Sequence, residues 1–250
     1  MKNIAKLDTT LVFLDISFAK QVTDEGIAHF EGKVFPCFNS LYINGVTGIT
    51  SAGLNKWLKS FSDTLIDLEM ALCDQEDMKA DFFETLGHCR QLESLDCTGC
   101  YEIDDSMQQA FEKAMSKKGD DEGGKPGWHN CHTARLCGLA IGDMPLMAMS
   151  KLMPNLEHLE IPKCEKVTEF GLKSVLETNT NLEFLDINHI PAVTFPFLDE
   201  LKDTHPNLLI KRHAYQDVDF KKDNGLRVPR RLLVDIKKKK KKKGGKKKKK

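Results

Sequence analysis

The sequence predicts an α/β solenoid, with a curved parallel sheet on the concave side and helices on the convex side. One template, L-x-x-L-x-[apolar]-x-x-[C/apolar], recurs along the chain, as in "TLVFLDISFAKQVTDEGI" (10–27) and "NLEHLEIPKCEKVTEFGL" (155–172). Its first leucine-like position is found at Leu11, Phe38, Leu65, Leu92, Leu156, Leu182 and Leu208. The spacings are 27, 27, 27, 64, 26 and 26 residues. A fixed period in the twenties indicates stacked units, each a short strand followed by a helix.

The gap of 64 residues between Leu92 and Leu156 accommodates one further repeat and an insertion. The segment "TARLCGLAIGDMPLMAMSKLMP" (133–154) supplies a degenerate repeat whose register the sequence leaves open. Residues 1–210 are therefore predicted to form a leucine-rich-repeat solenoid of about eight units, with an inserted loop at 116–132. Residues 211–236 are expected to cap its C-terminal end, because an uncapped last repeat would expose apolar surface.

Each predicted unit begins with a strand in which Leu95 and Cys97, for example, point inward, whereas Asp96 faces solvent. A threonine precedes the helical pattern in four of the units, at a position where its side-chain oxygen can cap the helix. These residues are Thr23, Thr50, Thr168 and Thr194. The third unit, "CDQEDMKADFF", lacks this threonine, so its helix is expected to begin later.

Cys97 and Cys100 form a C-x-x-C that could belong to a metal site or a redox pair. Cys97 falls in the slot that Ile43 and Ile161 occupy in other repeats, and Cys100 falls in that of Val46. Both are therefore predicted to be small buried core residues. A zinc site would need a second ligand pair, and His129, Cys131, His132 and Cys137 match no structural zinc spacing. We expect no metal and no cofactor.

The formal net charge of zero conceals two regions of opposite sign. The terminal "KKKKKKKGGKKKKK" (237–250) holds 12 of the 37 basic residues, which leaves 25 basic against 37 acidic residues, or −12, in residues 1–236. This polylysine tail is predicted to be disordered and to attract an acidic polymer, either tubulin tails or nucleic acid. A solubilising or nuclear-targeting role is the alternative. Representative tail positions are Lys237, Lys240, Lys243, Lys246 and Lys250.

The solvent-facing strand positions predict a protein-binding surface on the concave face. They carry mostly carboxylates, at Asp15, Tyr42, Glu69, Asp96, Glu160 and Asp186, flanked by Phe13 and Phe184. Stacked like charges are expected to raise one another's pKa unless a cation offsets them. The ladder is predicted to receive a basic segment of a partner, or the chain's own lysine tail. The alternative is that acidic residues are simply common at this slot.

The stretches "HCRQLESLDCTGCYEIDDSM" and "NLEHLEIPKCEKVTEFGL" resemble the cysteine-containing subclass of leucine-rich repeats. This subclass is best known from F-box/LRR proteins and from the cell-cycle and ciliary proteins built like them. The resemblance implies a concave protein-binding surface. It also implies delivery of substrates to a cullin ubiquitin ligase where an N-terminal F-box is present. Because Leu11 already begins a repeat, no room is expected for an F-box, and the ligase role is not carried over.

The sequence thus predicts a non-enzymatic adaptor or scaffold within a cytoskeletal or ciliary assembly. No Ser/His/Asp or Cys/His arrangement stands out from residues that the repeat itself requires. A ubiquitin-ligase substrate receptor and a nuclear, nucleic-acid-associated protein are the alternatives. The chain has no signal peptide pattern and no apolar run of membrane-spanning length, so the cytoplasm is expected and the nucleus is the alternative.

Overall fold

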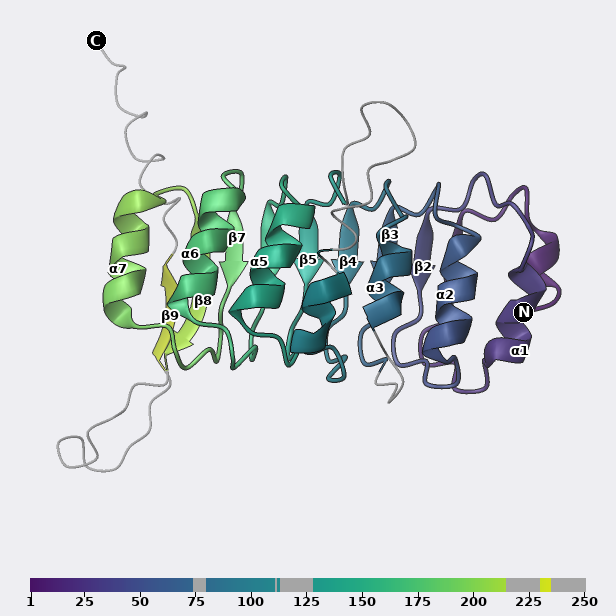
Figure 1. The fold of residues 1–250 in the computed structure, drawn as a ribbon, viewed down its shortest axis with the longest axis horizontal. Coiled ribbons are helices and arrows are strands. Elements are labelled where there is room, and N and C mark those ends of the chain that lie inside the picture. Colours follow the sequence, from purple (N-terminus) through teal and green to yellow (C-terminus); the bar gives the residue numbers. More distant parts are fainter. Residues whose placement is uncertain (74–79, 111, 113–127, 215–229, 235–250) are drawn as a thin grey trace, which may run out of the picture.

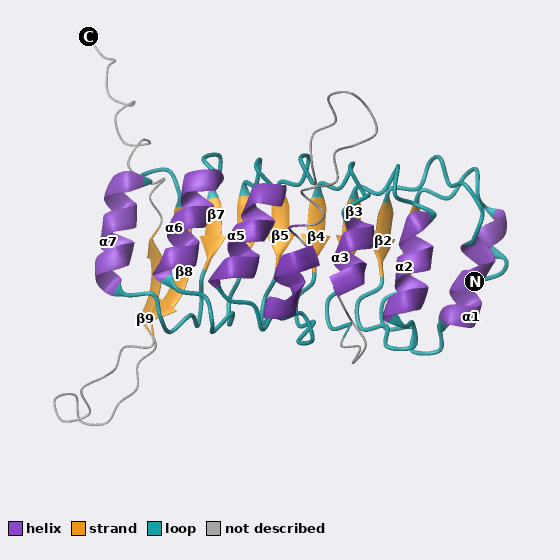
Figure 2. Cartoon of the chain, viewed as in Figure 1, coloured by secondary structure: helices purple, strands orange, loops and turns teal. Residues whose placement is uncertain are grey.

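The computed structural model describes residues 1–73, 80–110, 112, 128–214 and 230–234. These residues form an elongated body in which the strands run in chain order along one sheet and a single layer of helices covers one of its faces (Figures 1 and 2). The strands are β1 (Phe13–Asp15), β2 (Ser40–Tyr42), β3 (Asp67–Glu69), β4 (Ser94–Asp96), β5 (Thr133–Arg135), β6 (His158–Glu160), β7 (Phe184–Asp186), β8 (Leu209–Ala214) and β9 (Arg230–Val234). The predicted α/β leucine-rich-repeat solenoid is confirmed.

The strands from β1 to β8 are parallel and pair in register, so that equivalent repeat positions form rows across the sheet. The second residue of each of the strands β1–β8 is buried, and the row consists of leucine except for Ala134 and Ile210. A second buried row follows the strands and includes Ile43, Cys97 and Leu136. Side chains alternate between the two faces of the sheet. Each short strand, together with the residue that follows it, therefore adds two buried side chains to a continuous core.

The helices cover the convex side. They are α1 (Asp24–Ile27), α2 (Ser51–Lys59), α3 (Ala80–Leu86), α5 (Asp143–Leu152), α6 (Glu169–Thr178) and α7 (Phe195–Thr204), with 3-10 turns at Ile4–Lys6, Ala28–Phe30 and Asp105–Met107. Thr50, Thr168 and Thr194 accept hydrogen bonds from backbone N–H groups of the helices they precede. Thr23 occupies the same position but makes no such bond, which corrects that part of the prediction.

A carboxylate from the preceding repeat supports each of these capping threonines. The Asp24 carboxylate accepts hydrogen bonds from the Thr50 backbone N–H and hydroxyl, at 2.8 and 2.6 Å. Asp143 does the same for Thr168, at 2.7 and 2.6 Å, and Glu169 for Thr194, at 2.7 and 2.6 Å. Neighbouring helix starts are thereby joined by a ladder of charge-assisted hydrogen bonds, which sequence spacing had not revealed.

The hydrogen bonds between neighbouring helix starts predict a pH-dependent contribution of Glu169 to the stability of the fold. Its hydrogen bonds from Thr194 hold the pKa of Glu169 below its ordinary value of 4.5. A lowered pKa stabilises the fold above pH 4.5, and the contribution is lost as the pH falls through the lower, folded-state value. We expect Glu169→Gln to be less stable than wild type at neutral pH, with the difference closing in acid. Urea unfolding at several pH values measures this, and a pH-independent difference would contradict it.

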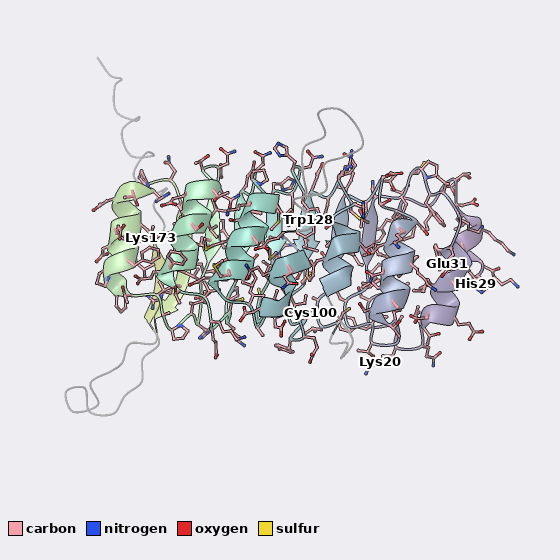
Figure 3. The ribbon with its side chains drawn as sticks, in the orientation of Figure 1. Lys20, His29, Glu31, Cys100, Trp128 and Lys173 are labelled. Atoms are coloured by element: carbon pink, nitrogen blue, oxygen red, sulfur yellow. The ribbon has the colours of Figure 1, made fainter. Side chains whose placement is uncertain are left out.

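The structure settles the register of the fifth repeat. Its strand β5 places Ala134 beside Leu95 and Arg135 beside Asp96, so Cys131 takes the buried position of Leu92. The repeat is hard to recognise because cysteine and alanine replace two of its leucines. Trp128, which immediately precedes it, is fully buried, and its indole N–H donates to the Leu86 carbonyl at 2.9 Å (Figure 3). It therefore covers the core next to α3.

The C-x-x-C cysteines lie in the core. Cys97 and Cys100 are buried, and the Cys100 thiol lies 3.0 Å from the Met70 carbonyl oxygen of the preceding repeat (Figure 3). Cys73 and Cys164 make the equivalent contact with their own preceding repeats, at 3.0 and 3.1 Å. The recurring cysteine is therefore a small core residue whose thiol meets a backbone carbonyl one repeat away.

At the C-terminal end, β9 pairs antiparallel with β8 and covers the edge of the parallel sheet. A paired edge no longer offers free backbone groups to another chain. The predicted cap is described in part only, since Tyr215, Phe220 and Leu226 lie outside the described residues. The polylysine tail (237–250) also lies outside them, so its predicted role stays a prediction.

Candidate protein-binding surface

The strands present three rows of side chains on the concave face, and β1–β4 differ from β5–β8 in charge. On β1–β4 and the residues that follow each strand, these rows contain four carboxylates and no basic side chain. We call these strands the acidic half; its carboxylates are Asp15, Asp67, Glu69 and Asp96. They lie on β1, β3 and β4, and the parallel register places Glu69 directly beside Asp96 on the next strand, about 4.8 Å away.

An aromatic pair lies at the N-terminal end of the acidic half. Phe13, which is 47% exposed, meets the Tyr42 ring edge to face, with centroids 4.9 Å apart. The Tyr42 hydroxyl donates to the Asp67 carboxylate at 2.6 Å, and this bond, with partial burial, raises the pKa of Tyr42 to about 12. The other Asp67 oxygen is buried without a hydrogen-bond partner. Tyr42 thus separates Asp15 from Glu69 in their row, and its hydroxyl links it to the Asp67 carboxylate on the adjacent strand.

The carboxylates of Asp15 and Asp96 point toward the C-terminal ends of their strands. Asp15 accepts a hydrogen bond from the backbone N–H of Ser17, and Asp96 accepts one from Thr98, both at 2.8 Å. The bonds from Ser17 lower the pKa of Asp15. The expectation that stacking raises the pKa is therefore wrong for Asp15, because local donors stabilise the charged form of this exposed carboxylate.

Glu69 is positioned by a polar residue on the neighbouring strand. Its carboxylate accepts a hydrogen bond from the Asn44 side-chain amide at 2.9 Å, and the Asn44 side-chain oxygen accepts one from the Ala71 backbone N–H at 2.8 Å. The amide holds the carboxylate in place without neutralising it. Glu69 therefore remains a fixed negative charge in the middle of the acidic half.

On β5–β8, by contrast, the carboxylates are paired with cations of the same face. Arg135 lies 3.3 Å from the Glu160 carboxylate. It was not among the predicted site residues, because the sequence left the register of the fifth repeat open. His158 reaches the same Glu160 oxygen at 2.8 Å and stacks on Phe184, with ring centroids 4.2 Å apart. Glu160 and Phe184 thus lie together, but in an internally compensated cluster rather than in a free acidic ladder.

Asp186 departs furthest from its predicted role. Its side chain is 2% exposed and lies 2.7 Å from the Lys211 ammonium group. The Asn188 amide also donates to it, at 2.6 Å. The pairing with Asp186 raises the pKa of Lys211. An aspartate enclosed in this way has little surface to offer a partner, because Lys211 and Asn188 occupy its oxygens.

The buried thiols offer no evident reactive nucleophile. Burial raises the pKa of Cys73 to about 11 and that of Cys131 to about 12, and it raises the pKa of Cys97 well above its ordinary value. Thiols with raised pKa values are largely unreactive, since the thiolate is the attacking species. In the part of the chain that the structure describes, no group of three His, Cys, Asp or Glu residues is arranged to hold a metal ion.

A surface pocket of about 270 Å³ lies on the convex side, between α1 and α2. Carboxylates of Asp24 and Glu31 and the ammonium group of Lys56 line it, above the buried Trp57 (Glu31 is labelled in Figure 3). Asp24 is already engaged by Thr50, and Lys56 lies 4.0 Å from Glu31. Among the described residues, no helix is long and apolar enough to span a bilayer.

No protein-family model and no curated protein matches this chain. Among solved structures, it is similar to the crystal structure of internalin C2 from Listeria monocytogenes, with 17% identity and a TM-score of 0.51, covering 80% of this chain and 69% of that one. The Rad7–Elc1 complex from yeast matches at 15% identity and a TM-score of 0.37, covering 84% and 71% of the respective chains. The likeness to internalin C2 shows that this chain shares the solenoid fold.

Proposed function

We propose that this protein is a non-enzymatic leucine-rich-repeat adaptor that binds a basic protein segment on the acidic half of its concave face. One observation carries the proposal: the concave rows of β1–β4 hold four carboxylates without a cation, whereas Glu160 and Asp186 on β5–β8 are ion-paired. Uncompensated charge on one patch attracts partners of opposite charge and sets their orientation.

The neighbouring aromatic pair strengthens the proposal. Phe13 is half exposed beside Tyr42, and exposed aromatic side chains are enriched in protein interfaces. Of the predicted site residues, Asp15, Tyr42, Glu69, Asp96 and Phe13 therefore belong to the proposed surface. Glu160, Asp186 and Phe184 are assigned to the compensated cluster next to it, where they shape the sheet rather than attract a cation.

The test is charge reversal within the acidic half. Full-length wild type, Glu69→Lys/Asp96→Lys and the control Glu165→Lys/Glu177→Lys would be affinity-purified, and their partners compared by mass spectrometry. The control makes the same change in net charge at two exposed positions away from the concave rows. We expect the first variant to bind its partners roughly tenfold more weakly or worse, which corresponds to a loss of about 1.4 kcal/mol in binding free energy. The control variant should keep its partners. Retention of every partner by both variants would contradict the proposal.

A cytoskeletal or ciliary setting is the second part of the proposal, and it is supported by the resemblance to cysteine-containing repeats and by the cationic tail. Removal of residues 237–250 is expected to release tubulin or axonemal proteins while leaving partners of the acidic half bound. Salt-sensitive nucleic-acid binding that depends on the tail would instead favour the nuclear alternative. A cullin adaptor retained with and without the tail would favour the ubiquitin-ligase alternative.

A further inference from the structure

The turn after each of the strands β1–β7 adopts a left-handed backbone conformation, and in two repeats a bulky apolar residue occupies it. The residues at this position with positive φ are Phe18, Gly45, Leu72, Gly99, Gly138, Lys163 and His189. Glycine accepts this conformation readily, whereas a large side chain is strained in it. Phe18 has a φ of 62° and Leu72 a φ of 58°, yet they are 63% and 48% exposed. Burial of these two side chains therefore does not account for their presence.

Each of these apolar side chains lies over a glycine of the next repeat. A Cβ on Gly45 would come within 2.6 Å of the Phe18 ring, and a Cβ on Gly99 would come within 2.6 Å of the Leu72 side chain. Tyr101, which is 57% exposed, lies in the same way beside Gly138, at 3.3 Å. We call Phe18, Leu72 and Tyr101 the apolar rim; they follow the C-terminal ends of β1, β3 and β4.

The apolar rim spans the same repeats as the acidic half. Beyond it, the equivalent turn positions carry the polar residues Lys163 and His189. The carboxylates of Asp15 and Asp96 also lean toward the rim, because each accepts a hydrogen bond from a backbone N–H two residues later. An acidic row and an exposed apolar row thus run side by side across the first strands of the sheet.

We propose that this double row binds a basic amphipathic helix of a partner, with its cations on the carboxylates and its adjacent apolar face on the rim. The inference rests on the proposed function and specifies the class of partner. Phe18 and Leu72 follow strands two apart, about 9.6 Å, which is close to the roughly 10.5 Å rise of seven helical residues. The chain's own tail (237–250) contains only lysine and glycine, so it offers nothing to the rim.

The experiment measures binding of fluorescent peptides to the full chain by anisotropy at physiological salt. The probe is a helix of about 18 residues made of lysine, leucine and alanine, long enough to cross β1–β5, with lysines and leucines on adjacent faces. One control peptide has the same composition, but its lysines and leucines are spread over all sides of the helix. The other has the sequence of residues 237–250. The protein variants are Phe18→Gly/Leu72→Gly and Glu69→Lys/Asp96→Lys.

Glycine at Phe18 and Leu72 removes the rim side chains but suits the left-handed backbone, so a folding defect cannot mimic a binding defect. We expect the thermal unfolding midpoint of this variant to equal or exceed that of wild type. Its affinity for the amphipathic peptide should fall at least tenfold, to the level of the control peptides. The wild type should bind the amphipathic peptide at least tenfold more tightly than either control.

Full affinity in the glycine variant, or equal binding of the lysine–glycine peptide to wild type, would overturn the inference about the rim. If Glu69→Lys/Asp96→Lys nevertheless loses binding, the proposed acidic surface stands and only the rim is refuted. If this charge variant binds like wild type and also keeps its native partners, the proposed function fails as well. If no peptide binds the wild type, although charge reversal releases native partners, an amphipathic helix is the wrong class of partner.

Discussion

Replacing Trp128 with alanine is expected to lower the free energy of unfolding by about 3–5 kcal/mol. The side chain is fully buried at the beginning of the fifth repeat, and its ring centroid lies 6.5 Å from that of Phe83. The indole N–H also donates to the Leu86 carbonyl. Both contacts are with α3 of the third repeat, so removing Trp128 leaves a cavity between that helix and the beginning of the fifth repeat. Urea unfolding followed by circular dichroism measures the loss.

The variant Trp128→Phe separates the contributions of volume and hydrogen bonding, and Tyr101→Ala serves as a control at an exposed aromatic residue. Trp128→Phe keeps most of the ring but lacks the N–H donor, and we expect it to cost about 1–2 kcal/mol, since the Leu86 carbonyl still accepts from the Cys89 backbone N–H. Tyr101→Ala removes an exposed aromatic and is expected to change stability by less than about 0.5 kcal/mol. A loss below about 1 kcal/mol for Trp128→Ala would show that the fifth repeat does not depend on this residue.

Replacing Gly53 with alanine is expected to destabilise the protein by about 1–3 kcal/mol, although alanine is the better helix former. Gly53 lies in the first turn of α2, and a Cβ there would come within 2.0 Å of the Asp24 carboxylate. That carboxylate accepts both hydrogen bonds from Thr50, so the added methyl group would displace the ladder between α1 and α2. Gly53 is thus required by a side chain of the neighbouring repeat.

A double-mutant cycle tests this explanation. Asp24→Ala alone should cost about 1–3 kcal/mol, because it leaves the Thr50 groups without their acceptor. In that background, Gly53→Ala should become neutral, or stabilising by up to about 1 kcal/mol, since only its effect on helix propensity remains. The sign change is the informative result. Equal costs of Gly53→Ala in both backgrounds would mean that the carboxylate is not what excludes the side chain.

The concave surface was only partly predictable from the repeat pattern. Counting positions placed Asp15, Glu69 and Asp96 on one row, and the structure has them there. The pattern could not show that Asp186 is enclosed by Lys211, because Lys211 follows the last repeat and meets Asp186 only through strand pairing. Arg135 was missed for a related reason: a fifth repeat with cysteine and alanine in leucine positions has no recognisable register.

The sequence by itself determined the architecture of this protein, because a repeat that buries the same positions every 26 or 27 residues has one way to stack them. It also determined that Cys97 and Cys100 are core residues, since they take the place of aliphatic residues elsewhere. Only the tertiary structure decided which carboxylates remain unpaired and which exposed apolar side chains lie beside them. Those properties depend on side chains from adjacent repeats, and a pattern read along one repeat contains no information about its neighbours' charges.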